Sequence, residues 1–94
     1  MLYRAVSDAE SQQIARTGTF ELGRAAQGKY FWDRPEHAVE FAQRIQDPFV
    51  VRATYLTQAA AQFVVLTFDA IGTGRFASEE QMNQGLLEIV RYED

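Results

Sequence analysis

The chain contains no cysteine and only one histidine, which excludes several kinds of chemistry. Without cysteine there is no disulfide, no thiolate metal site and no cysteine nucleophile. The lone His37 cannot build a histidine-rich metal site, and no serine is followed by a convincing base for a Ser-His-Asp hydrolase. We therefore expect no metal site, and the candidates for chemistry are arginine, aromatic residues and carboxylates.

Long apolar runs and an excess of basic residues are absent too. No stretch approaches the length of a membrane span, and the first residues lack the charged-then-apolar pattern of a secretion signal. We therefore expect a cytoplasmic protein, or a fragment delivered by other means, without a membrane contact. With 9 basic and 13 acidic residues the net charge is −4, which disfavours direct electrostatic binding to nucleic acid.

What the chain does contain is enough apolar material for one core. Its 94 residues are 47% hydrophobic and include seven Phe and four Tyr. Aromatic rings give a small core bulky, well-defined pieces. We expect a single domain over residues 1–94, because this length supports one modest core.

The first half of the chain alternates strands and helices. Residues 2–6 and 29–32 predict strands, separated by a helix to about residue 17 and a loop of small and polar residues over 23–28. Ser7 opens the helix with a capping-box pattern, and Gly18 provides the left-handed residue that ends it.

A second helix follows. Asp33 begins another capping-box pattern, and Pro48 stops the helix. Four apolar residues at helical spacing form one stripe on it: Ala38, Phe41, Ala42 and Ile45.

The second half predicts three more strands, at residues 49–57, 63–68 and 86–92. Residues 58–62 read as a turn or a single helical turn, and 69–74 as a loop. The almost entirely apolar run 63–68 is typical of a central strand buried on both faces. A third capping-box pattern predicts a short helix between Ser78 and Gly85. The expected fold is α+β, with two main helices and a mixed or mainly antiparallel sheet.

Arg4 and an aromatic run are the first candidates for binding. The planar, permanently charged guanidinium of Arg4 can hold a phosphate or a ribose hydroxyl. Tyr30, Phe31 and Trp32 can stack on a flat ring, with Tyr30 and Trp32 on one strand face and Phe31 on the other. The alternatives are a surface arginine laid over aromatic neighbours and three aromatics that pin the strand to the next helix.

Carboxylates near the last strand are the candidates for catalysis. Glu88 is flanked by apolar residues, and a carboxylate that points from such a strand into a cleft has a perturbed pKa. Glu80 lies slightly earlier, beside Glu79. The alternative places Glu88 on the solvated face of an edge strand, and the other two in the first turn of a helix, where the dipole favours acids.

Several short segments resemble small ADP-ribosyltransferase-like domains, which occur as toxin modules in bacterial polymorphic toxins and in phage or mobile-element proteins. They are Leu2–Ser7, Ile14 with Thr17–Phe20, Gly28–Trp32, Pro35–Ala38, and Asp69–Gly72 through Arg75–Phe76. The resemblance implies a split, strongly bent sheet with NAD as co-substrate in the cleft between its halves.

The resemblance also implies roles for individual residues. The first-strand arginine, Arg4, would contact the nucleotide, and Tyr30 would pack on the nicotinamide side with Phe31 or Trp32 beside it. A glutamate, or less often a glutamine or aspartate, near the last strand would bind the nicotinamide ribose and assist the transfer; this is Glu88, with Glu80 and Gln84 behind it. The implied function is an NAD-binding ADP-ribosyltransferase or NAD glycohydrolase that acts on a protein or nucleic-acid target.

Two other functions fit the same sequence. A non-catalytic binding or inhibitor protein on this scaffold would dock its acidic surface on a basic protein partner. A structural or oligomerisation domain would use an exposed strand edge as its interface. The enzyme hypothesis requires Arg4, Tyr30 and one carboxylate to converge on a cleft, and it is weakened if Arg4 is salt-bridged on a buried face. The binding hypothesis predicts no such convergence and a contiguous acidic patch.

Overall fold

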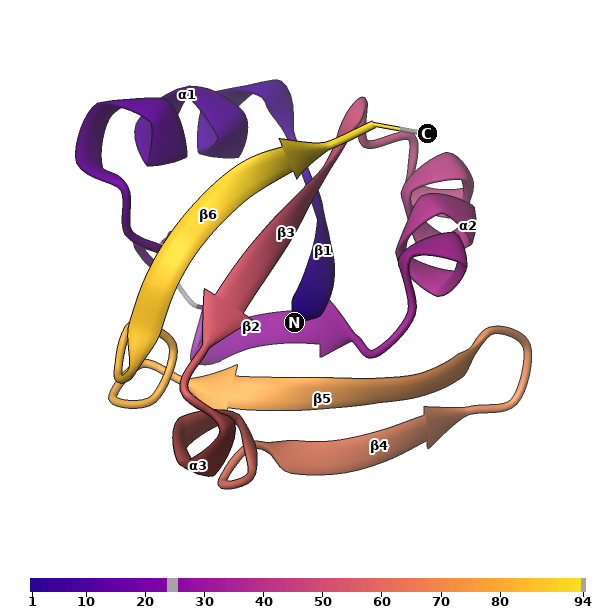
Figure 1. The fold of residues 1–94 in the computed structure, drawn as a ribbon. Coiled ribbons are helices and arrows are strands. Elements are labelled where there is room, and N and C mark those ends of the chain that lie inside the picture. The colour runs from indigo at the N-terminus through magenta and orange to yellow at the C-terminus, as the bar shows by residue number, and fades with distance from the viewer. Residues whose placement is uncertain (24–25, 94) are drawn as a thin grey trace.

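The computed structural model describes residues 1–23 and 26–93, which form one six-stranded antiparallel sheet and three helices, an α+β architecture (Figure 1). The helices are α1 (Asp8–Thr17), α2 (Pro35–Ile45) and the single-turn α3 (Thr57–Ala60). The strands are β1 (Leu2–Val6), β2 (Gly28–Trp32), β3 (Phe49–Tyr55), β4 (Val64–Phe68), β5 (Gly72–Ser78) and β6 (Leu86–Tyr92). The loop expected at residues 23–28 lies partly outside the described residues, since residues 24 and 25 are not among them.

The sheet is divided into two halves. Its strand order is β4-β5-β2-β1-β3-β6, and neighbouring strands pair antiparallel. β1 shares five residue pairs with β3, but only Tyr3 and Trp32 are in register between β1 and β2. Figure 1 shows the β4-β5-β2 half crossing the β1-β3-β6 half at a steep angle. The expected α+β class with a mainly antiparallel sheet is therefore confirmed.

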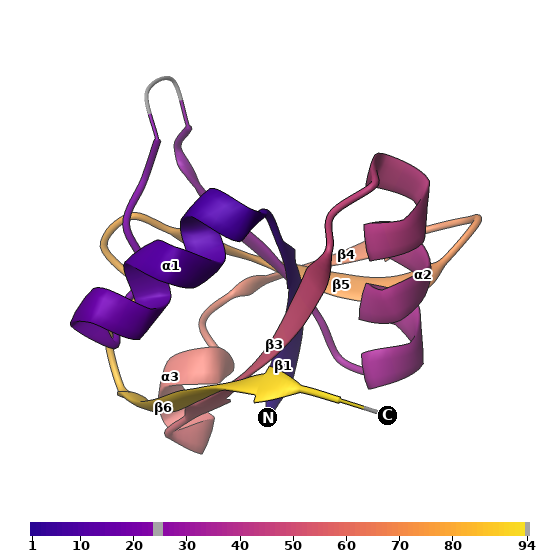
Figure 2. The same cartoon turned by 90° about the horizontal axis from the view of Figure 1, so that it is seen from above.

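The two long helices lie on opposite sides of the β1-β3-β6 half, as Figure 2 shows from above. The larger core extends from α1 to the inner faces of both halves; its fully buried members include Val6, Phe20 and Phe31. The smaller core lies beneath α2, where Trp32 and Ala38 are buried together. Alternation along β1 and β2 assigns neighbouring residues to different cores.

The ends of α1 follow their sequence signals. The Ser7 hydroxyl accepts a hydrogen bond from the Glu10 amide at 3.1 Å, and Gly18 ends the helix with φ +69°. The Glu10 carboxylate does not return to the Ser7 amide as the capping box predicts, because it binds the side chain of Arg4 instead.

Within the described ranges, no helix is long and apolar enough to cross a membrane.

The start of α2 differs from the prediction. Arg34 occupies the N-cap position without a side-chain hydrogen bond, and Pro35 follows in the first turn. Asp33, the predicted cap, instead forms an ion pair of 2.8 Å with Arg75 on β5. A long-range arginine thus outcompetes the local capping bond, which the sequence pattern around Asp33 cannot reveal.

The predicted central strand is in fact at the edge of the sheet. β4 pairs with β5, and its Val64 and Val65 side chains are more than half exposed. The prediction of burial on both faces was wrong because the position of a strand depends on the order of pairing and not on its apolar content. β5 was not predicted at all, because Gly72 and Gly74 read as loop residues.

The short helix predicted over 78–85 is a series of turns. The Met82 amide donates to the Ser78 carbonyl at 2.9 Å, but no helical run continues from it. Within this segment Asn83 makes a long-range connection: its side chain accepts from the Phe20 amide and donates to the Phe20 carbonyl, both at 2.8 Å. The turns therefore hold the extended segment after α1 in place.

Asn83→Ala is expected to lower the free energy of unfolding by about 1 to 3 kcal/mol, because it leaves both backbone groups of Phe20 without partners. Asn83→Asp keeps the acceptor but places a carboxylate oxygen against the Phe20 carbonyl, so it should not restore the lost stability. Urea unfolding followed by circular dichroism measures both. Equal stability of Asn83→Ala and the unmodified chain would contradict the bonding role.

Candidate functional site

Arg4 lies on the inner face of β1, close to the junction of the two halves. It pairs across the sheet with Val51, a member of the larger core. Its Nε and Nη2 atoms donate to the Glu10 carboxylate at 2.7 and 2.9 Å, and Nη1 donates to the Tyr30 carbonyl at 2.9 Å. The arginine thereby connects β1, the first turn of α1 and β2.

Lys29 completes a charged cluster of three residues, Arg4, Glu10 and Lys29. The Lys29 ammonium lies 3.5 Å from the Glu10 carboxylate, and the residue is only 7% exposed. Burial of Glu10 by itself would raise its pKa, but the hydrogen bond and charge of Arg4, with the charge of Lys29, outweigh burial and hold it below the ordinary value. Burial and then the charge of Arg4 lower the pKa of Lys29. The cluster thus contains two cations that repel each other and one ionised carboxylate.

Two members of the charged cluster, Glu10 and Lys29, line a surface pocket of about 390 Å³, which lies within the range of roughly 300–1,000 Å³ typical of small-molecule sites. Its lining residues come from the start of α1, the segment that follows it and β2: Ser7, Ala9, Glu10, Gln13, Glu21, Leu22, Gly23 and Lys29. Glu21 is exposed at the rim. The Lys29 side chain therefore faces a pocket although it is nearly inaccessible as a whole.

The three predicted aromatic residues do not form a common stacking surface. Phe31 is fully buried in the larger core, with the Phe20 ring 5.3 Å away, and Trp32 is buried beneath α2. Only Tyr30 is substantially exposed, at 47%. Its ring contacts Phe76 at a centroid distance of 5.1 Å, on the face of β2 opposite to Lys29. Arg4 therefore meets the backbone of Tyr30 and not its ring.

The predicted carboxylates also lie apart from Arg4. Glu88 pairs with Thr54 on β3, whereas Arg4 pairs with Val51, so alternation sends their side chains to opposite faces of the sheet. Glu80 is exposed in the turns between β5 and β6. The carboxylate that does meet Arg4 is Glu10, which the sequence pattern had assigned to helix capping. Within residues 1–23 and 26–93, no group of His, Asp or Glu side chains could hold a metal ion.

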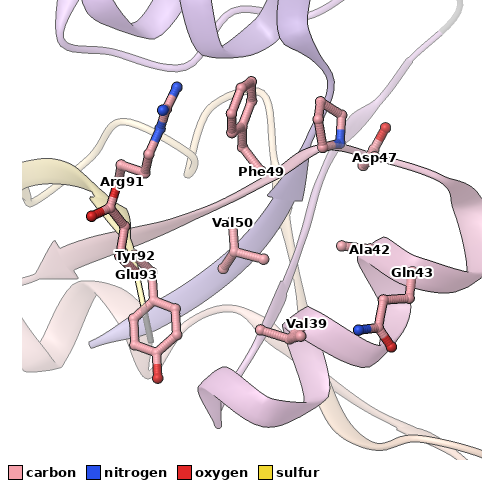
Figure 3. A pocket seen from close by; sticks show the side chains of 10 residues that line it. Val39, Ala42, Gln43, Asp47, Phe49, Val50, Arg91, Tyr92 and Glu93 are labelled. Atoms are coloured by element: carbon pink, nitrogen blue, oxygen red, sulfur yellow. The ribbon is translucent and has the colours of Figure 1, made fainter.

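A second pocket lies between the end of α2, the start of β3 and the end of β6, and Figure 3 shows it from close by. The Arg91 guanidinium stacks on the Phe49 ring at 3.8 Å from the ring centre. Asp47 also lines it, with a pKa raised by burial. None of the residues predicted from the sequence lines this pocket.

Glu10 and Lys29 were missed by sequence reasoning because each already had a local explanation, a capping residue and the start of a strand.

Comparison with known proteins returns no match: no family model, no curated protein and no solved structure matches this chain. Its function has to be inferred from its own residues.

Proposed function

We propose that this chain is an NAD-binding module of the ADP-ribosyltransferase-like kind, in which Lys29 at the pocket holds the pyrophosphate and Arg4 lies behind it through their shared Glu10. The observation that carries the proposal is the charge of the cluster, because two nearly buried cations share a single carboxylate. A phosphate in the adjoining pocket would relieve their mutual repulsion. Charge-assisted hydrogen bonds from arginine and lysine to phosphate are among the stronger polar interactions in proteins.

The architecture supports the same proposal. The resemblance implies a split, bent sheet with the dinucleotide between its halves, and β1 and β2, where the two halves meet here, pair at Tyr3–Trp32. The charged cluster lies beside that pair, where β1 and β2 diverge. A first-strand arginine in this place is what the resemblance assigns to nucleotide contact.

The residues fit the central pyrophosphate of NAD and not its rings. Tyr30 is the one exposed aromatic of the three, and its ring lies on the other face of β2 from the cluster. Glu88 lies on the other face of the sheet from Arg4. Bound NAD would supply an activated ribose for transfer to a protein or nucleic-acid target, and the described side chains support its binding.

A non-catalytic binding protein is the second candidate. Arg4 and Glu88 do not converge on one cleft, and this observation favours the second candidate. The enzyme hypothesis requires such convergence, whereas the binding hypothesis does not. The chain carries 13 acidic and 9 basic residues, so a basic protein is the matching partner.

Lys29→Met is expected to weaken NAD binding about tenfold or more, because it removes the cation that lines the pocket and keeps the apolar stem. Isothermal titration calorimetry measures the affinity, and nicotinamide release measures turnover. The matched control is Arg44→Met, which removes an exposed cation from α2 that pairs with Glu40. The control should bind NAD like the unmodified chain.

The ligand series separates the two candidates. Binding of both NAD and ADP-ribose, without nicotinamide release, supports a binding module whose contacts are to the phosphates. If neither ligand binds the folded chain, the NAD proposal is overturned, and immobilised chain should then retain a basic protein. Equal loss in Lys29→Met and Arg44→Met would mean a general charge effect and would contradict the site.

A further inference from the structure

β4 presents an unprotected edge of the sheet. Within the described residues it pairs with β5 alone, so its other side offers free backbone amide and carbonyl groups. Its sequence, Val64–Phe68, contains no charge and no proline, and its register with β5 shows no bulge. Natural proteins commonly protect exposed edges with charged residues, proline or a bulge, because an open edge can pair with a strand of another chain. β4 has none of these three features.

The opposite edge of the same sheet is protected. β6 carries Glu88 and Arg91, and its pairing with β3 shifts register between Thr54 and Tyr55. Self-pairing of β6 would bring like charges toward each other, whereas self-pairing of β4 would not. The contrast between the two edges therefore points to β4.

Apolar side chains continue from this edge onto the sheet. Val65 is 56% exposed on one face of β4. On the other face, Val64, Phe76 and Tyr30 form a row across three strands, in register with one another. Val64 and Tyr30 at the ends of this row are about half exposed. A strand added to β4 would cover the exposed valines and satisfy the free backbone groups together.

We infer that β4 pairs with β4 of a second copy of this chain, antiparallel and about a two-fold axis near Leu66. An antiparallel strand is complementary to itself, because two-fold symmetry places each residue opposite its own mirror position in the register. With Leu66 on the axis, Val65 lies opposite Thr67 of the copy. The pairing keeps all charges out of the contact although each chain carries a net charge of −4.

The free edge requires a strand as its occupant. The neutral character of β4 offers a charged peptide no counter-charge, whereas it suits an identical neutral strand. The result would be a continuous twelve-stranded antiparallel sheet across the dimer, twice the six strands of one chain. The interface is independent of the charged cluster at Arg4, so its test does not depend on NAD binding.

Thr67 is the residue for testing this pairing. Its side chain is exposed, it lies beside Thr73 on β5, and in the dimer it lies diagonally across from Thr67 of the copy. Thr67→Lys and Thr67→Glu each place like charges near the axis and are each expected to weaken dimerisation about tenfold or more. An equimolar mixture of the two variants should restore the dimer, because the charges then attract.

Sedimentation equilibrium at high micromolar concentration measures the assembly. The matched control is Leu87→Lys on β6, where the unmodified side chain is 61% exposed; this variant should remain dimeric. A monomeric unmodified chain overturns the inference. It is overturned equally if Leu87→Lys dissociates the dimer, or if the mixed Thr67 variants stay monomeric while circular dichroism shows both folded.

Discussion

Glu10→Gln is expected to lower the free energy of unfolding at neutral pH by about 2 to 3 kcal/mol. The carboxylate is the shared counter-ion of Arg4 and Lys29, and all three side chains are less than one-fifth exposed. Glutamine keeps the shape of the side chain and removes the charge, so two cations are left close together without compensation. We expect a smaller loss of stability than for a fully buried ion pair, because water still reaches the cluster.

The same variant should change how stability depends on pH. The pKa of Glu10 is held below its ordinary value of 4.5 in the folded chain, chiefly by Arg4 against the opposing effect of burial. A carboxylate with a depressed pKa contributes stability above its unfolded pKa and loses that contribution as pH falls through the folded pKa. The difference between the unmodified chain and Glu10→Gln should therefore shrink as the pH drops below about 4.5.

Urea unfolding over a series of pH values measures both effects. Asp8→Asn is the matched control, because Asp8 is an exposed acid in the first turn of the same helix, bonded to Gln12. Its loss should stay near the few tenths to 1 kcal/mol of a helix-dipole contact. Equal losses for Glu10→Gln and Asp8→Asn would contradict the role of the charged cluster.

Phe31→Ala is expected to cost about 3 to 5 kcal/mol of stability, the largest effect of a single substitution here. The ring is fully buried and contacts Phe20, Tyr55 and Phe63 at centroid distances between 5.3 and 6.0 Å. Its removal leaves a cavity between the two half-sheets. Thermal and urea unfolding measure the loss.

Tyr30→Ala is the control for the neighbouring position. That side chain is 47% exposed, so its removal should cost about 1 kcal/mol or less. The comparison distinguishes a core residue from a ligand contact. If Phe31→Ala is as stable as Tyr30→Ala but binds NAD more weakly, the Phe31 ring contacts a ligand and does not stabilise the core.

Local signals predicted the early part of the fold well. The cap at Ser7 and the left-handed Gly18 depend on neighbouring residues alone, and both are present. β5 was not predicted because its glycines are required by the packing of side chains that are distant in the sequence. A Cβ at Gly72 would meet the His37 ring at 2.4 Å, and one at Gly74 would crowd Trp32 and Phe68. Glycine there makes room for packed rings, which the sequence cannot distinguish from a loop.

The candidate site was predictable only in part. Arg4 was identified by its charge on a first strand, but its partner depends on how α1 returns over β1. The position of Glu88 depends on the register between β3 and β6, which places it on the face opposite to Arg4. A one-residue change of register would reverse that outcome, and no local pattern specifies it.

Chemical-shift mapping with NAD tests the central claim most directly. Titration of the ¹⁵N-labelled chain should shift the amide signals of residues within 7–13, 21–23 and of Lys29, which supply the lining of the pocket beside the charged cluster. ADP-ribose should shift the same signals, since the predicted contacts are to the phosphates. Shifts confined to residues 47–50 and 91–93, around the pocket in Figure 3, or no shifts at all would contradict nucleotide binding at the charged cluster.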